Sequence, residues 1–283
     1  MAVEIENQAT PFGREPWAHD GKRVVRYEKI GHVAIVEFDD PPANTYTHEM
    51  MRQLDEAILD ARFDSAVEVI VLTGAGGKFF SAGANIAMLN SVSPEFKYMF
   101  CLHANETLSR LEQTPKLVIA ALNGHTVGGG LEIAMAADIR IARRDAGKCG
   151  LPEVGLGVLP GTGGTQRLAR LVGKSRAMEL MISGRTFSYE QALEYGIVSE
   201  IYDGDAESFR DQVLTYAKQF TSPRKAPMAV GHIKRSVQTG AELPLQDALA
   251  LERELQSLLF KSEDAKEGIA AYNDKRTAHF TNH

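Results

Sequence analysis

The feature that most constrains the fold of this chain is a run of three glycines, Gly128 to Gly130. An apolar run, Leu117 to Leu122, precedes it, and a helix-like run, Leu131 to Ala137, follows it. This order predicts a buried strand, a glycine turn and the start of a helix. The backbone N–H groups at such a start are free to bind a ligand, and the helix dipole stabilises negative charge there. We therefore expect an anion-stabilising site at this turn.

Strand-like and helix-like segments alternate up to about residue 204. Val67 to Thr73 is β-branched and ends in four small residues, which is typical of a buried strand. The stretch from Thr47 to Phe63 has apolar residues at helical spacing, and Ser93-Pro94 is a good helix entry. The strands expected are 32–38, 67–73, 117–122, 138–142 and 198–202. This alternation indicates an α/β fold with crossover helices between its strands.

The remainder of the chain, from about Asp205, carries no strand signal. Helices are expected at 206–220, 226–238, 244–260 and 262–275, with prolines and a glycine between them. Their apolar faces need a partner, which is either the core or a neighbouring subunit. Residues 1–22 lack periodicity and carry two prolines and two glycines, so we expect a loosely held, flexible arm there. The expected layout is the arm (1–22), a catalytic α/β core (23–204) and a helical region (205–283).

Composition narrows the classes of function. The net charge of −6 argues against nonspecific binding to nucleic acid, which needs a positive surface. Two cysteines, Cys101 and Cys149, are too few for a disulfide framework and are expected to be small buried side chains. No apolar run approaches the roughly 20 residues that span a membrane, and the polar, acidic start is unlike a signal peptide. We expect a cytoplasmic protein that binds neither membrane nor nucleic acid.

Several familiar catalytic motifs are missing from the sequence. GAGGK at 74–78 has the wrong spacing for a Walker loop, no GxGxxG follows a strand, and no GxSxG is present. The eight histidines show no metal-ligand spacing, so no metal site is expected. The groups that remain for chemistry are carboxylates and glycine backbone.

These groups suit a reaction at the carbon next to a thioester carbonyl. Such a reaction places negative charge on the carbonyl oxygen, and two preorganised N–H donors stabilise that charge best. The glycine turn supplies one donor, and the small-residue loop Ala82-Gly83-Ala84 is the candidate for the other. Glu132, in the first turn of the helix, and Glu153, in the next glycine-rich loop, are candidate proton carriers.

Each of these features has an ordinary structural explanation when it is taken singly. An acid in the first helical turn complements the helix dipole, an acid in a loop is commonplace, and three glycines can make a tight turn. In combination the features favour an acyl-thioester enzyme.

Three segments resemble signature segments of the crotonase (enoyl-CoA hydratase/isomerase) superfamily, and the sequence is closest to its enoyl-CoA hydratases. They are FFSAGANI, NGHTVGGGLEIAMAADIRIA and LPEVGLGVLPGTGGTQRL, in the family's order and spacing. The resemblance runs from about residue 24 to the carboxyl end. It implies a spiral of ββα units with a C-terminal all-helical trimerisation region, and trimers that commonly pair into hexamers. It also implies activity on acyl-CoA thioesters without a metal or redox cofactor.

Carried onto this sequence, the resemblance implies roles for individual residues. Ala84 and Gly129 would provide the oxyanion-hole N–H groups, and Gly161 would help to hold the catalytic water. Glu132 would activate that water and Glu153 would protonate the α-carbon, as a coupled pair. Hydratases of the family keep both glutamates, whereas double-bond isomerases generally keep only the second. The expected activity is therefore hydration of a 2-enoyl-CoA to a 3-hydroxyacyl-CoA.

The acyl-CoA contacts are expected from a wider set of positions. Asn85 and Ala87 depart from the residues usual in the family, and Tyr46 departs where it could narrow or polarise the acyl pocket. Lys275 matches a basic position that reaches a CoA phosphate in relatives, sometimes across a subunit boundary. The substrate and CoA contacts expected are Ala82, Asn85, Ile86, Ala87, Leu89, Tyr46, Phe260 and Lys275.

Two other functions stay open on the sequence alone. Another crotonase reaction, such as Δ3,Δ2-isomerisation or cleavage of a C–C bond, needs the same thioester site. A binding or scaffolding role, including the RNA binding of one branch of the superfamily, is disfavoured because the segment 48–63 contains no lysine.

Overall fold

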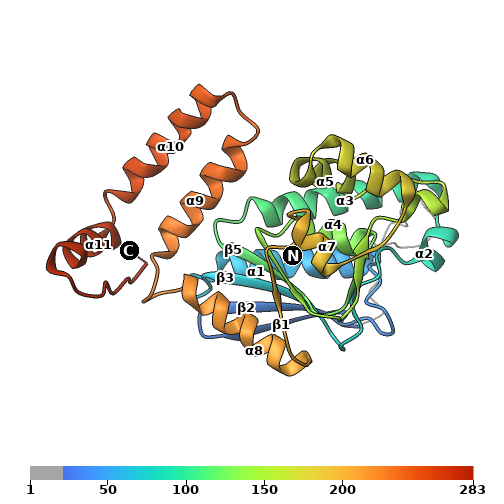
Figure 1. Ribbon diagram of the computed structural model, residues 1–283, viewed down its shortest axis with the longest axis horizontal. Coiled ribbons are helices and arrows are strands. Elements are labelled where there is room, and N and C mark those ends of the chain that lie inside the picture. The colour runs from blue at the N-terminus through green and yellow to red at the C-terminus, as the bar shows by residue number, and fades with distance from the viewer. Residues whose placement is uncertain (1–21, 283) are drawn as a thin grey trace, which may run out of the picture.

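The computed structural model describes residues 22–282 and contains two sheets flanked by helices (Figure 1). The arm expected at 1–22 lies outside the described residues, apart from Lys22. The larger sheet has six strands in the order β1-β2-β3-β5-β7-β10, with β1 antiparallel to β2 and the other neighbours parallel. Its strands are β1 (Val25–Ile30), β2 (Val33–Phe38), β3 (Val69–Gly74), β5 (Leu117–Leu122), β7 (Ile139–Arg143) and β10 (Glu200–Tyr202).

Helices cover both faces of the larger sheet. Successive residues of a strand point to opposite faces, and in β3 this alternation separates two hydrophobic clusters. Ile70 joins the cluster that contains α1 (His48–Phe63) and α3 (Pro94–Glu112), whereas Val69 joins the cluster that contains α8 (Ala206–Ala217). The other core helices are α2 (Ile86–Ser91), α4 (Gly129–Met135), α5 (Gly164–Val172), α6 (Lys174–Ser183) and α7 (Tyr189–Glu194).

The local signals predicted several boundaries closely. Ser93 caps α3 by accepting a hydrogen bond from the Phe96 N–H, and Thr47 caps α1 in the same way. Ser188 and Gln191 form the capping box of α7. The strand expected at 117–122 is β5.

The smaller sheet was not predicted. Its strands are β4 (Phe79–Ser81), β6 (His125–Val127), β8 (Lys148–Gly150) and β9 (Phe187–Ser188), in the order β4-β6-β8-β9. Two or three residues are too few to show a periodic pattern. Strand β1 was missed for another reason: it is an edge strand whose residues are mostly exposed, so it lacks the apolar run of its neighbours.

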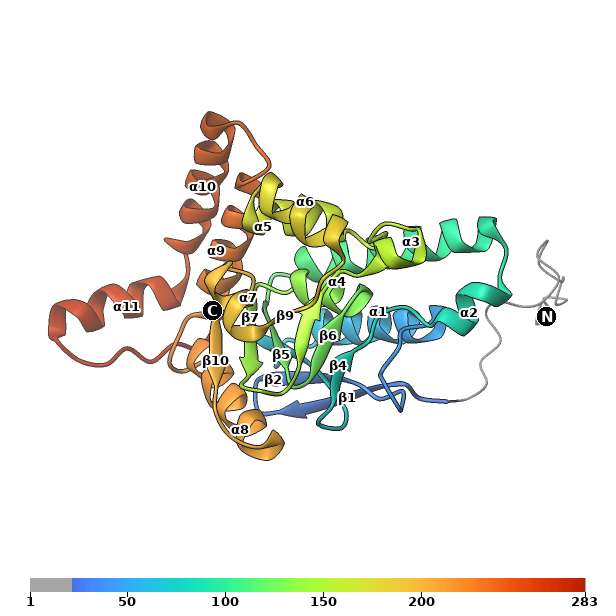
Figure 2. The same ribbon diagram turned by 45° about the vertical axis from the view of Figure 1, so that its right-hand side comes forward.

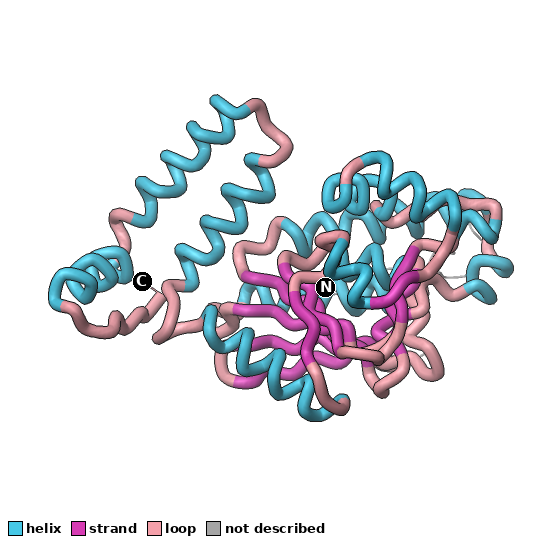
Figure 3. The backbone as a smooth tube through the Cα atoms, viewed as in Figure 1, coloured by secondary structure: helices cyan, strands magenta, loops and turns pink. Residues whose placement is uncertain are grey.

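The last three helices project from the core, as Figure 1 and Figure 2 both show. They are α9 (Pro227–Gly240), α10 (Leu245–Leu259) and α11 (Glu263–Asp274); Figure 3 shows that only loops join them. Buried Lys234 anchors α9, with its Nζ 2.9 Å from Asp138 Oδ2 and 3.0 Å from the Lys116 carbonyl oxygen. Among the described residues, no helix is both long and apolar enough to span a bilayer.

Candidate active site

Two glycine-containing loops meet at the centre of the candidate site. Strands β4 and β6 pair in parallel, so the loops that follow them lie side by side. A Cβ on Gly130 would lie 2.3 Å from the Ser81 carbonyl oxygen, and a Cβ on Gly83 would lie 3.0 Å from the Gly129 nitrogen. Only glycine permits such close backbone contact. The small residues predicted from the sequence are therefore required where the loops meet.

The two N–H groups predicted for the oxyanion hole lie in these loops. Gly129 is the first residue of α4, so its N–H has no acceptor within the helix. Tyr46 forms a parallel bridge with Ala84, through bonds from Tyr46 N–H to Gly83 O and from Asn85 N–H to Tyr46 O. Because these bonds use the groups on either side of Ala84, the Ala84 N–H points away from the Tyr46 backbone.

Glu132 is buried one turn into α4, with an exposed fraction of 2%. Its Oε1 accepts hydrogen bonds from the Thr162 N–H at 2.8 Å and the Gly164 N–H at 2.6 Å. Burial raises the pKa of Glu132 to about 7; the two amide hydrogen bonds oppose this rise and the nearby Glu153 adds to it. A carboxyl group with a pKa near neutrality can exchange a proton with water at physiological pH.

The raised pKa predicts that Glu132 destabilises the fold at high pH. Below the ordinary pKa of 4.5 the carboxyl is protonated in both folded and unfolded chains. As the pH rises from there to about 7 the unfolded chain ionises first, so stability is lost over that interval. Because both amides donate to Oε1, a glutamine oxygen can accept the same bonds. We expect Glu132→Gln to raise the free energy of unfolding at pH 8 by roughly 1–3 kcal/mol, and far less at pH 5.

Denaturant unfolding at the two pH values measures this difference. Glu194→Gln provides the matched control, because it makes the same chemical change at an exposed position. A Glu132→Gln protein less stable than wild type at pH 8 would show that ionised Glu132 stabilises the fold instead.

Glu153 lies on the other side of the glycine turn, at the start of the 3-10 turn η1 (Glu153–Leu156). A Cβ on Gly128 would lie 2.8 Å from Glu153 Oε1, so the carboxylate is packed against the turn. Its Oε2 is buried and has no hydrogen-bond partner among residues 22–282, and burial raises the pKa of Glu153. Leaving a carboxylate oxygen unpaired costs free energy, and a catalytic role is one of the explanations for a buried group of this kind.

The loop from Gly161 to Gly164 connects the site to α5. The Gly161 carbonyl accepts a hydrogen bond from Asn105 Nδ2 at 3.2 Å, and Arg167 Nη1 donates to the Thr162 carbonyl at 3.1 Å. The loop holds Glu132 through the amides of Thr162 and Gly164. These two contacts were not predicted from the sequence. Backbone donors carry no signal in the residue type, so only the fold reveals them.

Comparisons with known proteins show the family of the chain. The family model described as enoyl-CoA hydratase/isomerase matches residues 28–283. The short-chain-enoyl-CoA hydratase of Clostridium acetobutylicum is 38% identical over 252 residues, covering 88% of this chain and 94% of that protein. The probable enoyl-CoA hydratase of Bacillus subtilis is 37% identical over 249 residues, covering 88% and 95%. The enoyl-CoA hydratase structure from Geobacillus kaustophilus has a TM-score of 0.89 at 44% identity, covering 93% of this chain and 98% of that one. The chain belongs to the enoyl-CoA hydratase/isomerase (crotonase) family.

The predicted crotonase fold is thereby confirmed, and the protein is an enzyme of the crotonase family. Acyl-CoA substrates are implied by that membership.

Five of the predicted CoA contacts lie together, at the loop after β4 and on α2. Asn85 caps α2 by accepting a hydrogen bond from the Met88 N–H at 2.9 Å, and its Nδ2 donates to Thr45 Oγ1 at 3.1 Å. An aspartate at this position would have no proton to donate to Thr45 when it is ionised. The five positions are Ala82, Asn85, Ile86, Ala87 and Leu89.

Two of the predicted acyl-CoA contacts, Phe260 and Lys275, lie far from this site in a single chain. Phe260 follows α10 and Lys275 follows α11, and both are exposed. The projecting helices that carry them lie at the opposite end of the molecule from α2 (Figure 2). Within a single chain these two residues therefore contact neither the glutamates nor the loops predicted to form the oxyanion hole.

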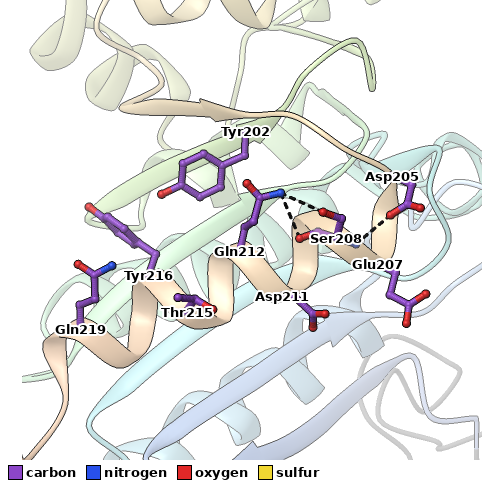
Figure 4. Close-up of a pocket in the computed structure, with 9 residues that line it drawn as sticks. All are labelled: Tyr202, Asp205, Glu207, Ser208, Asp211, Gln212, Thr215, Tyr216 and Gln219. Carbon is purple, nitrogen blue, oxygen red and sulfur yellow. Dashed lines mark hydrogen bonds between the residues drawn. The ribbon is translucent and has the colours of Figure 1, made fainter.

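A cavity of about 640 Å³ between β10 and α8 is also separate from the predicted site (Figure 4). Tyr202, Tyr216 and several acidic side chains line it. The hydrogen bond from Ser208 N–H to Asp205 Oδ1, at 2.9 Å, is the N-cap of α8. None of the residues predicted for acyl-CoA chemistry lines this cavity.

Proposed function

We propose that this crotonase is a 2-enoyl-CoA hydratase, which adds water across the double bond to give a 3-hydroxyacyl-CoA. The observation that carries the proposal is the pair of glutamates on either side of the glycine turn, of which Glu132 is buried and Glu153 is half-buried. Glu132 lies in the helix that starts at the turn, and Glu153 packs against Gly128. The hydratases among the similar proteins support the same reaction.

The proposed reaction divides between backbone and carboxylates. The thioester oxygen accepts hydrogen bonds from the Ala84 and Gly129 N–H groups, which stabilise the enolate. Ionised Glu132 takes a proton from a water held with the help of Gly161, and the hydroxyl adds to the β-carbon. Protonated Glu153 then gives its proton to the α-carbon. Proton exchange restores the starting state, in which the coupled pair carries one proton.

Hydration uses both acids, and this separates it from its nearest alternative. Moving a double bond needs one proton shuttle and no activated water. Glu132 is a buried carboxyl group of raised pKa that two amides hold in place. An isomerase of this kind does not need such a group. Raising the pKa of that acid makes it a stronger base near neutral pH.

The helical region 205–283 supplies the remaining contacts in this proposal. We infer that it is the oligomerisation region, because its projecting helices expose apolar side chains that a single chain leaves uncovered. In a trimer or a hexamer, Phe260 would border the acyl pocket and Lys275 the CoA phosphates of a neighbouring catalytic core (23–204). The exposed large apolar side chains of this region are Ile233, Val237, Leu243, Leu245, Leu258, Phe260, Ile269 and Tyr272.

A panel of enoyl-CoA thioesters that differ in length, branching and ring structure tests the proposal. We expect the wild-type protein to form the 3-hydroxyacyl-CoA from at least one of them, with the hydroxyl oxygen derived from labelled water. The rate should rise with pH through a value near 7 as Glu132 ionises. A protein that binds these thioesters but hydrates none would favour isomerisation or C–C bond cleavage.

A further inference from the structure

Tyr46 reaches the catalytic loop from a different part of the chain. Its side chain is buried, with an exposed fraction of 3%, and its hydroxyl lies 2.8 Å from Thr162 Oγ1. The two residues are 116 positions apart in the sequence. Thr162 is also the residue whose N–H holds Glu132. The Tyr46 hydroxyl thus contacts the residue that holds the predicted base.

Packing fixes the Tyr46 ring in one place. A Cβ on Gly129 would lie 2.0 Å from Tyr46 Cε1, so the ring fills the space that a side chain at Gly129 would need. The Phe100 ring also packs against it, with the centroids 5.4 Å apart and the planes at 30°. Because both contacts hold the ring, it cannot turn its hydroxyl away from Thr162 without repacking the core.

We propose that Tyr46 is a positioning residue for Glu132, and that it acts by fixing Thr162 through their shared hydroxyl hydrogen bond. The loop also has polar anchors at Gly161 and at the Thr162 carbonyl. Both of those hydrogen bonds are made to backbone carbonyls. The Thr162 side chain is bonded by Tyr46 instead. With Thr162 fixed on both sides, its N–H stays directed at Glu132 Oε1.

If Tyr46 fixes Thr162, loss of the Tyr46 hydroxyl should change the pKa of Glu132 in a known direction. The amide hydrogen bonds lower its pKa against the effect of burial, so loosening Thr162 should raise that pKa. The other groups that act on Glu132 or interact with it are Tyr46, Cys101, Glu153 and Arg167. Tyr46→Phe removes one hydroxyl and alters none of these charges, since burial keeps the Tyr46 phenol neutral by raising its pKa.

The titration of Glu132 is the direct measurement. Carbon-13 labelling of the glutamate carboxyls gives a resonance that Glu132→Gln identifies by its loss. We expect the midpoint in Tyr46→Phe to lie about half a pH unit or more above that of wild type. Under the hydratase proposal, the acidic limb of kcat/KM should shift equally, lowering the rate about threefold at pH 6 relative to the high-pH plateau.

Three further variants isolate the hydrogen bond. Thr162→Val should give the same shift as Tyr46→Phe, the double variant no further shift, and Thr162→Ser a near-wild-type titration. Tyr189→Phe is the matched control, because Tyr189 is equally buried and its hydroxyl lies 2.9 Å from Thr126 Oγ1. It should lower the melting temperature without moving the Glu132 midpoint.

The outcomes separate this proposal from the hydratase proposal. An unchanged Glu132 midpoint in Tyr46→Phe, or additive shifts in the double variant, would overturn the positioning role even in an active hydratase. The expected midpoint shift in a protein that hydrates no thioester would support the positioning role and reject the proposed activity. The catalytic consequence of the shift rests on the proposed function; the titration itself does not.

Discussion

We expect Glu153→Gln to lower kcat for the hydration of a 2-enoyl-CoA by about 10²–10⁴-fold. Glutamine has nearly the same shape as glutamate but cannot give up a proton near neutral pH, so the α-carbon would lose its acid. The packing against Gly128 should survive, because Glu153 Oε2 makes no hydrogen bond among the described residues that the change would break. Initial rates on whichever thioester is the best substrate measure the effect.

A second readout ties the loss to proton transfer. A 3-hydroxyacyl-CoA incubated with the wild-type protein in deuterated water should exchange its α-hydrogen for deuterium, because Glu153 removes that proton in the reverse reaction. Glu153→Gln should lose this exchange together with the rate. Glu194→Gln, an exposed change on α7, should leave both unchanged. A Glu153→Gln variant with the full hydration rate would remove Glu153 from the mechanism.

The elements of the core that the sequence predicted well are those set by local chemistry. α3 begins at the Ser93 cap and β5 coincides with the apolar run 117–122, because capping and burial are both readable within a few residues. The smaller sheet depends on pairing between segments far apart in the chain. Phe79 pairs with His125 there, and neither segment has a pattern of its own.

The candidate site likewise has features that the local sequence predicts and features that depend on distant segments. The need for small residues at Gly83 and Gly130 was foreseen, because backbone contact leaves a clear mark in the residue type. The amides that hold Glu132 and the contact between Tyr46 and Thr162 were not foreseen. They join elements that only the folded sheet order brings together. The catalytic roles of these residues stay predictions until kinetics test them.

We also expect a large loss of kcat in Gly130→Ala, because Gly130 lies where the two loops meet. The added methyl carbon would lie 2.3 Å from the Ser81 carbonyl oxygen, so the loop after β4 must move away from α4. Under the hydratase proposal, the Ala84 and Gly129 N–H groups would then no longer donate to one thioester oxygen. Since loss of one oxyanion-hole donor costs about 10²–10³ in kcat, we expect a loss of that order.

Gly155→Ala makes the same chemical change in η1, which begins at Glu153, and nothing lies within 4 Å of the position its methyl group would occupy. We expect it to keep the wild-type kcat. Gly130→Ala should still unfold cooperatively but bind a non-hydrolysable enolate analogue of the thioester far more weakly than wild type does. If Gly130→Ala retained the wild-type kcat and analogue affinity, the junction of the two loops would not be the oxyanion hole, because a displacement large enough to relieve a 2.3 Å contact would separate its two donors.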